Sequence, residues 1–219
     1  MIPTPPGGGK VPQLVLPNIW AFAPNRDTLG GTAHYLNHPD GGILVDCPAW
    51  NTANLAFLKT APVQALFLTH RGGVAQVHQW RSLLHCDLWI QEQEAYLLPG
   101  LSPRSFQFEV SLASDIQGFW VPGHSPGSSC LYWQTSGGVL FTGRHLLPDA
   151  QGNPVPIQTR KTFHWPRQVQ QVQAILDRFP PDRLSYICPG ANTGLLRGQG
   201  TIDRAYDRLK SVTSLEFSG

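Results

Sequence analysis

Residues 121–128 read Val-Pro-Gly-His-Ser-Pro-Gly-Ser, and this stretch decides more about the fold than any other part of the chain. It lies between two apolar runs, residues 119–121 and 129–133, which read as strands. The stretch places His124 in a glycine- and proline-rich turn directly after a strand. Because α/β proteins build their sites at strand ends that face a crevice, we expect a site at this turn.

Polar residues follow three other predicted strands in the same way. Strand 63–68 runs into Thr69-His70-Arg71, and strand 139–141 runs into Thr142-Gly143-Arg144-His145. The last strand, 186–188, is followed by Pro189-Gly190-Ala191. These strand ends supply the remaining candidate site residues.

Strands and helices alternate along the chain, which is typical of an α/β sandwich. The best helix covers residues 165–178, where Val169, Val172, Ile175 and Leu176 recur at helical spacing before a Pro-Pro stop. Helices are also expected at 51–58, 73–84, 92–97 and 201–212. The other expected strands are 14–16, 19–22, 32–36, 42–46, 87–90 and 106–110.

Composition restricts the class of protein. The 219 residues include 41% hydrophobic and only 14% charged residues, and 16 Lys and Arg stand against 14 Asp and Glu. A nearly neutral chain argues against a nucleic-acid partner or an acidic membrane partner. The N-terminus does not read as a secretory signal, and no apolar run is long enough to span a bilayer.

The four cysteines, Cys47, Cys86, Cys130 and Cys188, are scattered, so we expect buried thiols in a reducing cytoplasm. The expected organisation is a Pro- and Gly-rich lead-in over residues 1–13 and a single domain over residues 14–219.

Five segments in this order resemble the metallo-β-lactamase superfamily over about residues 14–197. They are the strand GILVD ending at Asp46, Thr69-His70, the segment from Gly123 to Ser128, Leu140-Phe141-Thr142-Gly143, and Cys188-Pro189-Gly190. The resemblance implies an αββα four-layer sandwich, in which two mixed β-sheets pack face to face with helices outside. Within the superfamily, the chain most resembles a cyanobacterial branch that has relatives in plastids.

The resemblance also implies a metal site, and here the chain departs from the pattern. Of the expected ligands it keeps His70 and His124, whereas Arg71, Gly72 and Gly73 follow His70 in place of further His and Asp ligands. Arg144 stands at the position of the bridging Asp, and Ala191 at that of the final His. At ~4 Å, with an effective dielectric constant near 20, a unit charge repels a divalent cation by about 8 kcal/mol, and arginine cannot lose its proton.

Three functions remain open. The first is a binding or regulatory module that has no cofactor and takes a small anionic ligand or a protein partner. Its ligand-binding residues would be His70, Arg71, His124, Ser125, Arg144 and His145, because guanidinium groups and glycine-rich turns suit carboxylates and phosphates.

The second function is a hydrolase of esters, thioesters or phosphoesters with one zinc or iron ion held by His70, His124 and His145. The third is a metal-free hydrolase in which His124 is the base and Ser125, Ser128 or Cys188 the nucleophile.

Three further features complete the analysis. Asp46 ends a strand early in the fold, and we expect a structural hydrogen-bond partner rather than a ligand. His78 is expected on the surface. The segment from Arg160 to Arg167 gathers cations around two aromatic residues, and it reads either as a rim for a partner or a ligand, or as a helix entry packed on the sheet.

Overall fold

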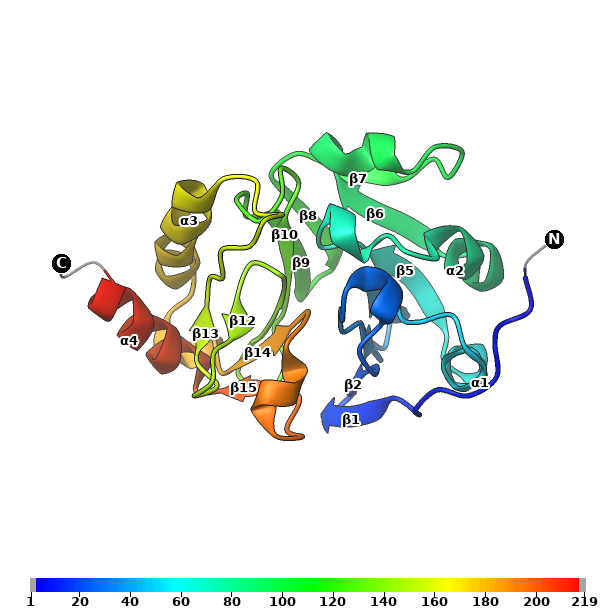
Figure 1. The fold of residues 1–219 in the computed structure, drawn as a ribbon, viewed down its shortest axis with the longest axis horizontal. Helices are drawn as coiled ribbons and strands as arrows, with labels where there is room; N and C mark the ends of the chain where they lie inside the picture. The colour runs from blue at the N-terminus through cyan, green and yellow to red at the C-terminus, as the bar shows by residue number, and fades with distance from the viewer. Residues whose placement is uncertain (1–2, 217–219) are drawn as a thin grey trace. The chain divides into compact units, whose positions relative to one another are not determined.

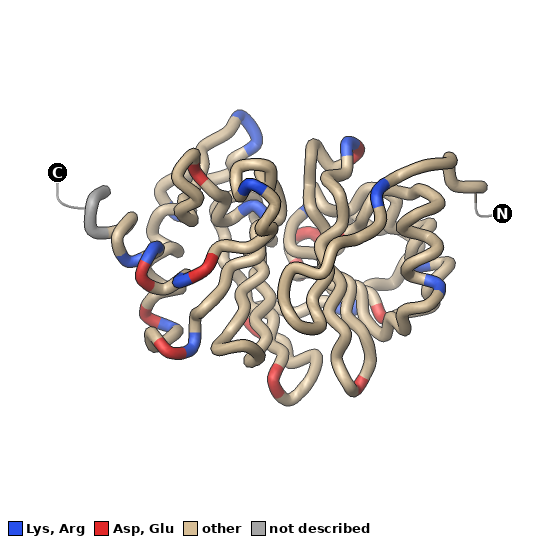
Figure 2. Tube along the Cα trace, turned by 90° about the horizontal axis from the view of Figure 1, so that it is seen from below, with Lys and Arg blue, Asp and Glu red and all other residues tan. Residues whose placement is uncertain are grey.

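The computed structural model describes residues 3–216. The chain divides after Gln107 into two compact units, each of which contains a mixed β-sheet and its own hydrophobic core (Figure 1). Charged residues are sparse along both units (Figure 2).

The first unit contains a seven-stranded sheet whose spatial order follows the sequence order. Neighbouring strands run antiparallel from β1 to β4 and parallel from β4 to β7. The strands are β1 (Gln13–Leu16), β2 (Ile19–Ala21), β3 (His34–Leu36), β4 (Gly42–Val45), β5 (Val63–Phe67), β6 (Asp87–Gln91) and β7 (Arg104–Phe106).

Helices connect the parallel strands of this sheet, since parallel neighbours need a crossover connection. α1 (Thr52–Thr60) links β4 to β5, and α2 (Val77–Leu84) links β5 to β6. Leu58 of α1 and Trp80 of α2 join one buried cluster with Leu44 and Leu66 of the sheet. Short 3-10 turns complete the unit: η1 (Arg26–Thr28), η2 (Arg71–Gly73) and η3 (Glu92–Leu97).

The lead-in lies along the start of α1. The hydroxyl of Thr52 donates to the carbonyl of Gly8 at 3.1 Å, and the indole of Trp50 donates to the carbonyl of Pro3 at 3.1 Å. β1 begins at Gln13, the last residue of the expected lead-in, and the lead-in over residues 1–13 stays a prediction. A single domain over residues 14–219 stays a prediction.

The second unit contains a six-stranded sheet in the order β15-β14-β11-β10-β9-β8. Its strands are β8 (Glu109–Ala113), β9 (Ile116–Trp120), β10 (Ser129–Trp133), β11 (Val139–Gly143), β14 (Tyr186–Pro189) and β15 (Ile202–Asp203). A two-stranded ribbon, β12 (Leu147–Pro148) and β13 (Pro154–Val155), precedes the helix α3 (Trp165–Arg178). The turns η4 (Pro181–Arg183) and η5 (Thr193–Leu196) and the helix α4 (Ala205–Glu216) follow.

α3 begins and ends where the sequence predicts. The ring of His164 accepts a hydrogen bond from the backbone of Arg167 at 3.2 Å, and Pro166 occupies the first turn, where no donor is needed. The buried face of the helix carries Val172, Ile175 and Leu176 into the core of the second unit.

The largest differences between prediction and structure concern three elements. The expected strand 106–110 is the end of β7 and the start of β8, which belong to different sheets. The expected helix 73–84 begins only at Val77, because Gln76 takes a left-handed conformation with φ 59°. The expected helix 201–212 begins at Ala205, because residues 202–203 pair with β14 instead.

All four cysteines are buried free thiols, as predicted. Among the described residues, no helix is both long enough and apolar enough to cross a membrane.

Candidate functional site

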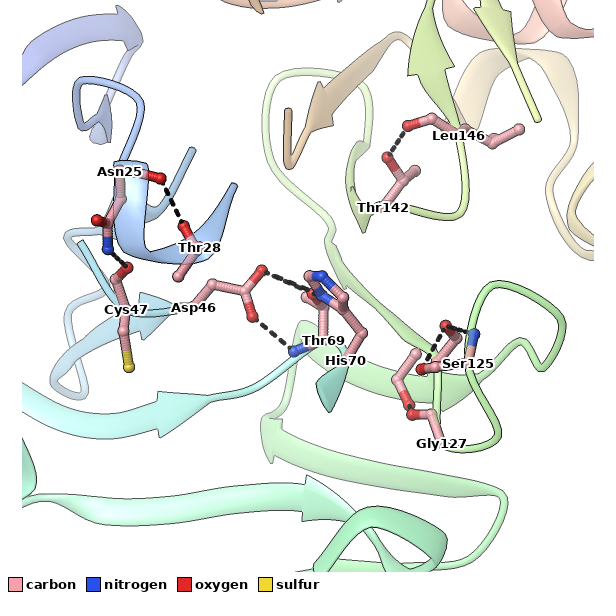
Figure 3. A network of polar contacts seen from close by, with 12 residues as sticks. Asn25, Thr28, Asp46, Cys47, Thr69, His70, Ser125, Gly127, Thr142 and Leu146 are labelled. Carbon is pink, nitrogen blue, oxygen red and sulfur yellow. Dashed lines mark hydrogen bonds and ion pairs between the residues drawn. The ribbon is translucent and has the colours of Figure 1, made fainter. Parts of the chain in front are cut away.

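In the first unit, Asp46 organises the strand end that carries His70 (Figure 3). Asp46 directly follows β4 in a left-handed conformation with φ 59°. Its carboxylate accepts a hydrogen bond from the backbone of Thr69 at 2.8 Å and another from the Thr69 hydroxyl at 2.6 Å. The expectation of a structural hydrogen-bond partner is therefore confirmed.

The same hydroxyl fixes the tautomer of His70. The Thr69 Oγ lies 2.9 Å from the Nδ1 of His70. An ionised carboxylate only accepts, so the hydroxyl hydrogen points to Asp46 and the hydroxyl oxygen accepts from Nδ1–H. The lone pair of His70 is therefore on Nε2, where it can bind a cation or accept a proton.

The two glycines after His70 make room for this network. A Cβ on Gly73 would lie 2.5 Å from the Oδ1 of Asp46, and a Cβ on Gly72 would lie 2.9 Å from the Nε2 of His70. Arg71, an expected ligand-binding residue, is exposed at the start of η2, and His78 is exposed as predicted. The glycine pair thus has a steric role in this unit.

Replacing Thr69 with valine is expected to lower the free energy of unfolding by about 1–3 kcal/mol. The substitution keeps the shape of the side chain but leaves buried Asp46 without a hydroxyl donor. Urea unfolding measures this change, and nitrogen NMR reads the tautomer of His70. Thr69→Ser keeps the hydroxyl and is the control. Equal stability of the valine and serine variants would contradict this account.

In the second unit, the turn at His124 is held by the segment before α3. The carbonyl of His124 accepts a hydrogen bond from the backbone of Phe163 at 3.0 Å, and that of Gly123 accepts one from His164 at 2.9 Å. Gly123 has φ 145°, and a Cβ there would lie 2.4 Å from the Cα of Gln168. Only glycine allows this close approach, and His124 is left 8% exposed.

The candidate nucleophile Ser125 is engaged within the turn. The Ser128 hydroxyl accepts from the backbone of Ser125 at 3.0 Å, and the two hydroxyl oxygens lie 3.1 Å apart (Figure 3). Both side chains are buried, and each hydroxyl pairs with the other rather than with a histidine. This pairing supports a structural role for the two serines.

Cys188, the other candidate nucleophile, lies within β14 and is buried. Burial raises the pKa of its thiol far above the usual range. A thiol held in the protonated form is a poor nucleophile, so the environment of Cys188 does not favour catalysis.

Strand register brings the remaining candidates to the same end of the second sheet. β10 and β11 are antiparallel with Leu131 opposite Phe141, so the start of β10 lies beside the end of β11. β11 and β14 are parallel, with Gly143 opposite Pro189. The turn at His124, the turn at Arg144 and the segment at Ala191 therefore meet at one sheet end.

At this end, Arg144 is half-buried and His145 is buried beneath the surface. Burial, together with the neighbouring His124, lowers the pKa of His145 to about 3, so its ring is neutral. The side-chain nitrogen of Gln168 donates to the His145 carbonyl at 2.9 Å. Both ring nitrogens of His145 and the Oε1 of Gln168 are buried without a hydrogen-bond partner among the described residues.

Sequence reasoning missed the role of Gln168. The signal that identifies it is positional, because helical spacing places Gln168 on the same face as Val172 and Ile175. A polar side chain on an apolar helix face is expected to have a buried polar partner, and here that partner is the backbone of His145.

The donor groups do not fit the metal centre that the resemblance implies. Residues 116–148 contain no Asp or Glu, so the turns around His124 and Arg144 supply no carboxylate to balance a divalent cation. Within residues 3–216, no group of three or more His, Cys, Asp and Glu side chains is arranged to hold a metal ion. The expected zinc or iron site takes His70 from the first unit and His124 and His145 from the second, and it stays a prediction.

No protein-family model matches the chain, and no curated protein matches its sequence. Solved structures match along nearly the whole chain. A metallo-β-lactamase from Pontibacter korlensis is 16% identical with a TM-score of 0.68, and the match covers 95% of this chain and 99% of that chain.

Two further solved structures give the same result. The metallo-β-lactamase superfamily protein ST1585 from Sulfolobus tokodaii is 10% identical with a TM-score of 0.61, covering 92% of this chain and 86% of that one. TTHA1623, in a di-iron-bound form, is 18% identical with a TM-score of 0.63, covering 82% and 92%. The structural similarity establishes the fold, whereas sequence identities this low leave the activity open. With its two mixed sheets and their helices, the chain therefore has the metallo-β-lactamase fold that its sequence predicts.

Proposed function

We propose that this protein binds a small anionic molecule at the end of its second sheet and acts as a binding or regulatory module. The ligand carries a carboxylate or phosphate group, which the guanidinium group of Arg144 receives beside His124. One observation carries the proposal: Arg144 is the only Lys, Arg, Asp or Glu within residues 116–148.

The electrostatics of this region favour an anion over a cation. His145 next to Arg144 is neutral, because burial lowers its pKa to about 3. Residues 116–148, which form the turns at His124 and Arg144, contain no Asp or Glu. A guanidinium group offers two parallel N–H donors to a carboxylate or phosphate, which gives both attraction and orientation.

The two hydrolase functions have less support. The metal-dependent hydrolase needs a ligand group that residues 3–216 do not assemble. The metal-free hydrolase needs an activated nucleophile, whereas Ser125 pairs with Ser128 and the pKa of Cys188 is raised by burial. The buried free cysteines fit the cytoplasmic location that we also propose.

Binding of inorganic phosphate and of acetate, followed by calorimetry, tests the proposal. Arg144→Gln is expected to weaken binding at least about tenfold, because a hydrogen bond to a charged group contributes about 1.5–3 kcal/mol. Arg144→Lys keeps the charge but loses the paired donors. Its affinity is expected to lie between that of the unaltered protein and that of Arg144→Gln. Arg183→Gln removes an exposed cation near the opposite end of the same sheet, beside Gly138, and is the matched control.

Two results would overturn the proposal. One is affinity for both anions that Arg144→Gln leaves unchanged. The other is stoichiometric zinc or iron in protein purified without chelator, with ester or phosphoester turnover that follows the metal content. Turnover that survives EDTA and disappears in His124→Ala would instead support the metal-free hydrolase.

A further inference from the structure

The second unit contains a cavity of about 500 Å³ that shares no lining residue with the turns at His124 and Arg144. The cavity lies where the turn between β12 and β13, the segment from η5 to β15, and α4 meet (Figure 1). Cavities of this size hold small molecules in proteins. All of its lining residues belong to the second unit, so it is a candidate ligand site separate from the one proposed above.

Arg208 of α4 holds the walls of the cavity together. Its guanidinium group donates to Asp203 of β15 at 2.9 Å and to Asn153 beside β13 at 3.4 Å. The turn before β13 is fixed by Asp149, whose carboxylate accepts from the backbones of Gln151 and Asn153, each at 2.8 Å. Walls that are connected in this way need little further ordering when a ligand binds, which favours affinity.

Arg197 gives the cavity an excess positive charge. Two arginines and one aspartate line the cavity, and the ion pair between Arg208 and Asp203 balances two of these charges. Arg197 is exposed, and its guanidinium group makes no hydrogen bond or ion pair with any residue from 3 to 216. A guanidinium group receives a phosphate or carboxylate through paired N–H donors, so this wall of the cavity attracts an anionic group.

The rest of the lining suits hydroxyl groups. Thr201 lines the cavity and is 7% exposed, yet its hydroxyl has no hydrogen-bond partner within the described chain. Buried hydroxyls are normally paired, so a ligand group is expected to complete its hydrogen bonding. Gln151 and Gln199 line the same cavity, and their amides can both donate and accept. The Asp203 carboxylate has acceptor sites beyond the one that Arg208 occupies.

We propose that this cavity binds an anionic sugar, which is a sugar that carries a phosphate or carboxylate group. The anionic group binds Arg197, and the sugar hydroxyls pair with Thr201, Asp203 and the two glutamine side chains. None of the described residues that line the cavity is aromatic, so a nucleobase has no ring on which to stack. The inference goes beyond the proposed function, because it places a second kind of ligand at a second site.

The test follows backbone hydrogen exchange over residues 195–203, because this segment lines the cavity and excludes the turns at His124 and Arg144. Glucose, glucose 6-phosphate, glucuronate and adenosine monophosphate are titrated separately, and the concentration that gives half of the protection measures each affinity. The tighter of the two anionic sugars is expected to bind at least about tenfold more tightly than glucose. Comparison of these two sugars shows whether the anionic group is a phosphate or a carboxylate.

Two variants assign the roles of the lining residues. In Arg197→Gln, the ratio of the anionic-sugar affinity to the glucose affinity is expected to fall to about one. Arg26→Gln removes an exposed arginine of the first unit and is expected to keep the ratio. Thr201→Val keeps the shape of the side chain but removes the hydroxyl, so it is expected to weaken all three sugars by a common factor of about two to ten. Circular dichroism and thermal unfolding check that each variant is folded.

Several results would contradict the anionic sugar. They are a ratio near one in the unaltered protein, a tenfold ratio that persists in Arg197→Gln, and unchanged binding of the sugars in Thr201→Val. Tighter binding of adenosine monophosphate than of both anionic sugars would indicate a nucleotide site instead. Arg144→Gln is expected to leave the protection of residues 195–203 unchanged. If it abolishes this protection while Arg197→Gln does not, the sugar binds at the end of the second sheet, and this inference fails while the proposed function stands.

Discussion

Lowering the pH from 7 to 5 is expected to reduce the free energy of unfolding by about 4 kcal/mol. The cause is the burial of His34 and His145, which lowers the pKa of each ring from 6.5 to about 3. Below pH 6.5 both rings take up protons in the unfolded chain but not in the folded protein. The stability that comes from keeping these two rings neutral is therefore fully present above pH 6.5. This contribution is lost as the pH falls toward 3.

Urea unfolding at pH 7, 6 and 5 measures the effect. His145→Leu removes one of the two groups and is expected to halve the pH dependence. The leucine variant also replaces two unpartnered buried nitrogens, so it is expected to be at least as stable as the unaltered protein at pH 5. His78→Gln alters an exposed ring and is the control. A pH dependence that His145→Leu leaves unchanged would show that His145 is hydrated in the folded protein.

Replacing Gly123 with alanine is expected to reduce the free energy of unfolding by at least about 3 kcal/mol. A Cβ at this position would lie 2.4–2.5 Å from the Cα, Cβ and backbone nitrogen of Gln168, and φ is 145°. The backbone of α3 cannot yield as a flexible side chain would, so the turn or the helix must move. Because the same turn carries His124, phosphate binding is expected to weaken as well.

Gly198→Ala separates the cost of a positive φ from the cost of steric overlap between the new Cβ and its neighbours. Gly198 also has a positive φ, 90°, but a Cβ there meets no atom within 4 Å. Its substitution is expected to cost only about 1 kcal/mol, the conformational penalty alone. Thermal and urea unfolding of the two variants gives the comparison. Similar losses of unfolding free energy in both variants would contradict this account. They would mean that α3 moves at Gln168 to make room for a Cβ on residue 123.

The local sequence pattern predicted the bounds of a helix or strand well where those bounds depend on residues within the element itself. The helix Trp165–Arg178 and the strand Ser129–Trp133 have the predicted bounds, because spacing, caps and prolines act within a few residues. The expected strand 106–110 was wrong, because a continuous apolar alternation does not reveal where the chain leaves one sheet for another. The expected helix 73–84 begins later, at Val77, because Gln76 takes a left-handed conformation that the apolar spacing does not reveal.

The candidate site shows the same division. Sequence order identified His70, His124 and Arg144, since each follows an apolar strand next to glycine or proline. It also predicted that the usual acidic ligands are missing, because that is a statement about residue types alone. Spacing along the chain contained no indication that Thr69 links Asp46 to His70, or that Gln168 contacts the backbone of His145.

The amino-acid sequence by itself determined the best helix, the near-neutral composition and the place of His70, His124 and Arg144 directly after apolar strands. Only the tertiary structure decided that Asp46 is bound by the Thr69 backbone and hydroxyl, that Ser125 pairs with Ser128, and that His145 is buried and neutral. The physical reason is that the period of a helix or strand is set by neighbours along the chain. Protonation, hydrogen bonding and burial are set by neighbours in space, which come from distant segments.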